Sequence, residues 1–128
     1  MAAILEKPEI KPVELLFRKE LPLDDKALLA LSLANPDLQL ERNAQGELIV
    51  MSPTGGKSSR RNAALVAQLY IWAKKDGTGT VFDSSGGFSL PNGAVRAPDA
   101  CWVSTEQLAK LTEEELEAFP PLCPEFVI

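Results

Sequence analysis

The stretch Val95–Val103 constrains the fold most, because it is a strand-like apolar run with a single carboxylate near its start. Pro98 stands where a strand can begin, and the residues after Asp99 are small, branched or aromatic, which favours a buried strand. A carboxylate beside a buried strand is costly without a partner. Two interpretations of Asp99 follow: a ligand for a divalent cation at the sheet edge, or a solvent-facing turn. Taken alone, Asp99 favours the turn.

The chain has 128 residues, which predicts one domain that buries roughly two-thirds of its unfolded surface. Residues 1–22 contain Pro8, Pro12 and Pro22 and are expected to form an N-terminal arm, with the domain at residues 23–128. No apolar run approaches the roughly 20 residues of a membrane span, and the first residues do not form a signal peptide. We therefore expect a cytoplasmic protein without a membrane partner.

The chain contains no histidine, which excludes Ser-His-Asp and Cys-His hydrolases and histidine-dependent metal nucleases. Its two cysteines, Cys101 and Cys123, are expected to be free buried thiols, and they cannot form a Cys/His zinc site. Catalysis would have to use carboxylates, Lys, Arg, hydroxyls or a bound metal. The net charge of −5 argues against strong non-specific nucleic-acid binding but leaves a local basic patch open.

The order of predicted elements favours an α/β fold with a mixed central sheet flanked by helices. A helix from Asp24 or Asp25 to Ala34, a hairpin of residues 38–42 and 47–51, and a long helix over about 57–75 come first. Leu65, Leu69 and Trp72 recur at helical spacing on the long helix and predict a core face.

The second half of the chain is expected to contain mostly strands. One begins at Val81, and a hairpin turns around Pro91–Gly93. Ser104 and Thr112 have the spacing of caps for two short helices, and residues 125–128 predict the start of another strand.

Five blocks resemble the Uma-two family of restriction endonucleases, which is abundant in cyanobacteria and belongs to the PD-(D/E)XK nuclease superfamily. Their order and spacing match over residues from about 38 to the last one. The blocks are Met51–Gly56, Val81–Ser85, Leu90–Gly93, Pro98–Val103 and Phe119–Ile128.

The resemblance implies a restriction-endonuclease-like fold and Mg²⁺-dependent (or Mn²⁺-dependent) cleavage of DNA. Asp99 matches the Asp of the superfamily's first motif and would hold the metal, which would lower the pKa of a bound water. This assignment requires Asp99 to lie beside the tip of the last strand.

The sequence departs from the superfamily pattern at the second motif, an acid followed two residues later by Lys. Glu125 is followed by Phe126 and Val127, so it does not form that motif. In the family the acid comes directly after the position of Ile128. The chain therefore resembles a member that lacks its C-terminal part and half of its active site. We expect negligible nuclease activity from residues 1–128 alone.

Two further sets of residues are candidates for the site. Asp83 is an additional candidate metal ligand, although the serines and glycines after it favour an Asx turn. Lys57, Arg60 and Arg61 lie in the first turns of the long helix, where the helix dipole disfavours cations. They are either DNA-phosphate contacts or an ordinary solvated helix start.

Other functions remain open at the level of sequence. A nuclease-like module without catalysis could bind DNA or a protein partner, and a plain interaction domain would bind no DNA at low salt. The unfinished terminal strand leaves an exposed edge, which predicts pairing with a second copy as a homodimer.

Overall fold

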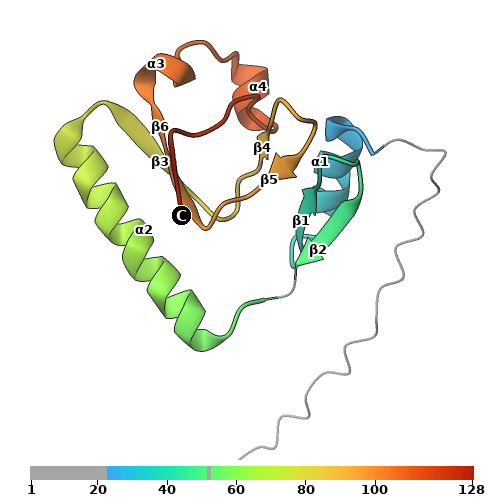
Figure 1. Cartoon of the computed structure of the whole chain (residues 1–128), viewed down its shortest axis with the longest axis horizontal. Coiled ribbons are helices and arrows are strands. Elements are labelled where there is room, and N and C mark those ends of the chain that lie inside the picture. Colours follow the sequence, from blue (N-terminus) through green and yellow to red (C-terminus); the bar gives the residue numbers. More distant parts are fainter. Residues whose placement is uncertain (1–22, 52) are drawn as a thin grey trace, which may run out of the picture.

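This computed structural model describes residues 23–51 and 53–128, which form four helices and seven strands (Figure 1). The predicted N-terminal arm lies outside the described residues. The first half contains α1 (Asp25–Ala34), β1 (Gln39–Arg42), β2 (Leu48–Met51), α2 (Gly56–Asp76) and β3 (Gly79–Asp83). The second half contains β4 (Phe88–Ser89), β5 (Val95–Arg96), β6 (Ala100–Ser104), α3 (Thr105–Leu108), α4 (Glu113–Glu117) and β7 (Phe126–Val127).

The strands form two antiparallel sheets, one of four strands in the order β2-β1-β5-β4 and one of three in the order β3-β6-β7. Together with the helices they make an α/β fold of the restriction-endonuclease-like kind, as expected. The expectation of a single mixed sheet is wrong for the described residues. The run Val95–Val103 is not one continuous strand.

The structure divides that run between the two sheets. β5 belongs to the four-stranded sheet and β6 to the three-stranded one, and residues 97–99 cross between them. Glu41 fixes the crossing, because its carboxylate accepts hydrogen bonds from the Ala97 backbone N–H (2.8 Å) and from the Arg96 guanidinium (3.0 Å). Glu41 is buried, so these bonds form away from bulk water. The crossing ends at Asp99.

Local capping explains why the helices begin where they do. The Asp24 side chain accepts the Ala27 N–H (2.7 Å) at the start of α1. Ser104 caps α3, and Thr112 forms a reciprocal capping box with Glu115 on α4. All three caps follow the predicted pattern, since each places a side-chain oxygen beside a backbone N–H that the helix leaves free.

Two apolar clusters form the core. Phe88, Cys101, Val103 and Leu122 lie on one face of the three-stranded sheet, and Leu28, Leu40 and Val95 join α1 to the four-stranded sheet. Both cysteines are free, as predicted, but only Cys101 is buried; Cys123 is exposed. Burial raises the pKa of the Cys101 thiol to about 11.

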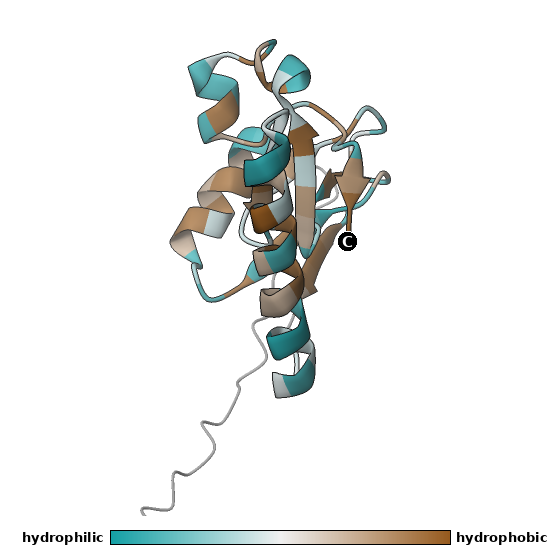
Figure 2. Ribbon diagram, turned by 90° about the vertical axis from the view of Figure 1, so that its left-hand side faces the viewer, coloured by the Kyte–Doolittle hydropathy of each residue, from teal (hydrophilic) through white to brown (hydrophobic). Residues whose placement is uncertain are grey.

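The long helix α2 packs less deeply than its sequence predicts. Its one fully buried residue is Ala73, Leu65 and Leu69 are half-buried, and Trp72 is 48% exposed. Trp72 meets the ring of Trp102 edge-on, with the ring centroids 5.6 Å apart. Figure 2 shows hydrophilic residues at both ends of α2 and apolar ones between them. The prediction of Trp72 as a core residue is wrong, because only one side of α2 meets the sheet.

The terminal strand β7 pairs with β6 and leaves its other edge without a strand among the described residues. The Ile128 N–H donates to the Ala100 carbonyl (2.8 Å), and the Asp99 N–H donates to the Ile128 carbonyl (3.1 Å). The tip of β7 therefore lies beside Asp99. Over the described residues, no helix is both long and apolar enough to cross a membrane.

Candidate active-site cleft

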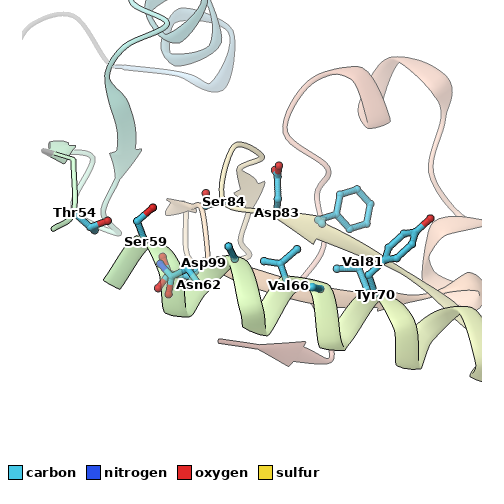
Figure 3. A pocket seen from close by; sticks show the side chains of 12 residues that line it. Thr54, Ser59, Asn62, Val66, Tyr70, Val81, Asp83, Ser84 and Asp99 are labelled. Atoms are coloured by element: carbon cyan, nitrogen blue, oxygen red, sulfur yellow. The ribbon is translucent and has the colours of Figure 1, made fainter. Parts of the chain in front are cut away.

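A cleft of about 880 Å³ separates the N-terminal two-thirds of α2 from the ends of β3 and β6 (Figure 3). The pairing of Asp83 with Ala100 places the last residue of β3 beside the first residue of β6. Both predicted acids therefore reach the same cleft from neighbouring strands. The walls consist of Thr54, Ser59, Asn62, Ala63, Val66, Ala67, Tyr70, Val81, Phe82, Asp83, Ser84 and Asp99.

Asp99 lies where the cleft meets the tip of β7. Its backbone is held by the hydrogen bond to Ile128, and its side chain is exposed and lines the cleft. Asp99 therefore lies beside the tip of the last strand, as expected. The carboxylate accepts no hydrogen bond from any described protein group, so its oxygens are open to a ligand.

Asp83 lines the same cleft, but its carboxylate serves the turn after β3. Its Oδ1 accepts the Ser85 hydroxyl (2.5 Å) and the Ser85 N–H (3.0 Å), which is an Asx turn. These two bonds hold the pKa of Asp83 below its ordinary value. In Figure 3 the Asp83 carboxylate points away from α2, whereas Asp99 lies at the α2 side of the cleft. The structure thus places Asp83 and Asp99 in one cleft without directing them at one point.

The basic residues Lys57, Arg60 and Arg61 are exposed on the first turns of α2 and do not line the cleft. None of them forms an ion pair with another described residue. They follow Gly55, the N-cap of α2, which makes no side-chain capping bond. They lie on the same turns of α2 as Ser59 and Asn62, which line the cleft.

Sequence reasoning missed Asn62 and Tyr70 on the cleft wall. Asn62 is half-buried, and Figure 3 shows its side chain at the end of the cleft where Asp99 lies. A polar residue within the sheet-facing stripe of α2 was the available signal, since a stripe that packs on a sheet is normally apolar.

The donor atoms in the cleft fit Mg²⁺ or Mn²⁺ in kind. Carboxylate, amide and hydroxyl oxygens are the hard ligands that these cations prefer, and the cleft wall offers all three types. The number of charged donors is small. Over the described part of the chain, no group of three or more Asp, Glu or Cys side chains is placed to share one ion.

The Uma2 family model, described as a putative restriction endonuclease, matches residues 25–128. This match covers most of the chain, and the fold and cleft described above agree with it. The chain belongs to the Uma2 restriction-endonuclease family. No curated protein matches it significantly.

Proposed function

We propose that this protein is a Mg²⁺-dependent DNA endonuclease domain whose metal site contains Asp99. We further propose that residues 1–128 alone cleave DNA negligibly. Family membership supports a nuclease with DNA as its substrate. The observation that carries the proposal is the position of Asp99, which lies at the head of β6, inside the cleft and bonded to the tip of β7.

The proposed inactivity follows from the number of acids at this point. Asp99 is the only carboxylate at the β7 end of the cleft within the described residues, since Asp83 points away and Glu125 binds Ser104. A residue joined to Ile128 would continue the ladder beside Asp99, and an acid there would supply the second charge. One carboxylate holds a divalent cation weakly.

A bound cation would lower the pKa of a water molecule and stabilise the charge that develops on the phosphate. The protein's own residues would position the metal ligand and the DNA. The bond to Ile128 holds the Asp99 backbone, and Glu41 holds the Ala97 backbone two residues before it. Arg60 and Arg61 would contact phosphates outside the cleft, where their charges have no protein partner among the described residues.

Charge reversal on α2 tests the DNA-binding part of this proposal. We expect Arg60→Glu with Arg61→Glu to weaken binding of duplex DNA at low salt by at least about tenfold, because two phosphate contacts become repulsive. Lys74→Glu with Lys75→Glu is the matched control: it reverses two charges on the same helix at its other end. Equal losses of DNA affinity in the two double variants would show that only net charge matters. That result would contradict a DNA-binding surface at Arg60 and Arg61.

The same mixtures report cleavage when supercoiled plasmid and Mg²⁺ are added. We expect the plasmid to stay intact. Mg²⁺-dependent nicking that disappears in Asp99→Ala would contradict the proposed inactivity while supporting the role of Asp99.

The second candidate is a nuclease-like module that binds DNA or a protein without catalysis. The small number of charged donors in the cleft favours it. Metal binding separates the two candidates, because a nuclease site must bind Mg²⁺ or Mn²⁺ through Asp99 and a module without catalysis need not.

A further inference from the structure

Asn62 is the polar member of a row on α2 that otherwise packs against the three-stranded sheet. Val66, Leu69 and Ala73 continue this row at helical spacing, and all four residues are half-buried or buried. An amide in such a row gives up the apolar contact that the other members of the row make with the sheet. The position of Asn62 therefore needs an explanation.

The protein supplies no such partner within the described residues. No hydrogen bond from another described group reaches the Asn62 amide. The amide is not sealed inside the protein either, because Trp102 Nε1 is the one buried side-chain polar atom that lacks a partner in this part of the chain. The Asn62 amide is therefore open to the cleft that it lines.

Asp99 resembles Asn62 in its exposure to the cleft and in its lack of a protein partner. It lines the same cleft, and its carboxylate also has no protein partner among the described residues. Figure 3 shows the two side chains at the same end of the cleft, with Asp83 directed elsewhere. An amide oxygen and a carboxylate oxygen without internal partners form the beginning of an oxygen ligand shell.

We propose that Asn62 supplies an oxygen ligand, beside Asp99, to the divalent cation of this site. The inference rests on the proposed function and adds a neutral donor from α2 to a site otherwise built from the ends of strands. A neutral amide adds an oxygen ligand without a further negative charge, so it adds no carboxylate repulsion when the cation is absent. Metal binding would then depend on the position of α2, because Asn62 lies on that helix.

Mn²⁺ affinity, measured from the electron paramagnetic resonance signal of free Mn²⁺, tests the inference without DNA or catalysis. We expect a dissociation constant on the order of millimolar for the 128-residue protein. Asn62→Asp converts the amide into a carboxylate and should tighten binding roughly tenfold. Gln68→Glu is the matched control, because it makes the same chemical change at an exposed position of α2 outside the cleft. It should change the affinity by less than about twofold.

The outcomes separate this inference from the proposed function. Equal tightening in Asn62→Asp and Gln68→Glu would overturn the inference, because the effect would be general attraction by added charge. Asn62→Ala should weaken binding by at least about threefold; an unchanged affinity would overturn the inference even if Asn62→Asp failed to fold. Equal Mn²⁺ binding by the unmodified protein and Asp99→Asn would instead overturn the proposed function, and this inference with it.

Discussion

Two exposed carboxylates near β7 differ in what their oxygens contact. Asp99 has no hydrogen-bond donor on its oxygens among the described residues, whereas both oxygens of Glu125 accept bonds from Ser104, one from its hydroxyl (2.5 Å) and one from its N–H (3.1 Å). The Ser104 hydroxyl is the main cause that lowers the pKa of Glu125 to about 2. Glu125 therefore has a structural role: it joins the start of β7 to the end of β6. Asp99 is left free for a ligand.

The Glu125 bonds should make part of the stability depend on pH. A depressed pKa means that the folded state favours the charged carboxylate, so this stabilisation is complete above the ordinary pKa of 4.5 and is lost as the pH falls toward about 2. We expect Glu125→Gln to reduce the dependence of urea-unfolding midpoints on pH over that range. The effect should be small, because the carboxylate is exposed to solvent. An unchanged pH profile would show that the Ser104 bonds do not persist in solution.

At the scale of elements, α2 is held by a narrow contact with the three-stranded sheet. Gly79 on β3 lies under the indole of Trp102, and a Cβ at this position would come within 2.3 Å of the ring. The ring in turn supports Trp72 of α2. Because Gly79 has no side chain, the Trp102 indole can pack over β3 and contact Trp72 of α2.

We expect Gly79→Ala to lower the free energy of unfolding by about 2 kcal/mol, because the indole must move and lose its contacts. Gly86→Ala is the control, since its Cβ would have no neighbour within 4 Å. Chemical denaturation monitored by tryptophan fluorescence measures both. A Gly79→Ala protein as stable as Gly86→Ala would contradict the packing described for α2.

Sequence patterns predicted the local elements better than their packing. The caps at Asp24, Ser104 and Thr112 and the turn at Asn92–Gly93 each depend on a few neighbouring residues, and all are confirmed. The division of Val95–Val103 between two sheets depends on the distant Glu41, which no local pattern reveals. The local sequence made Asp99 a candidate but favoured a turn, and only the family resemblance favoured a metal ligand. Asn62 was missed because a single amide on a helix belongs to no recognisable sequence motif. The cleft that it lines forms only when α2 packs against β3 and β6.

At the scale of the whole molecule, the outer edge of β7 is the least protected part of the described structure. Phe126, Val127 and Ile128 are 49%, 55% and 40% exposed. The Ile128 backbone faces β6, so alternation directs the Val127 backbone groups outward. An uncharged, apolar edge of this kind favours pairing with another strand.

We predict that the 128-residue protein forms a dimer through this edge, measurable by light scattering after size-exclusion chromatography. Val127→Lys should shift the protein to a monomer, because a charge on an edge strand opposes pairing. Leu33→Lys is the control: Leu33 is 74% exposed, on α1. A monomer at every concentration would contradict the prediction without affecting the metal site.

The most direct test of the central claim is a Mn²⁺ titration of isotope-labelled protein followed by nuclear magnetic resonance. Bound Mn²⁺ broadens signals near it, so we predict that Asp99, Ala100 and Asn62 broaden first and that Asp99→Asn removes the effect. Broadening centred on the exposed glutamates of α4, or a pattern that Asp99→Asn leaves unchanged, would contradict a metal site at Asp99.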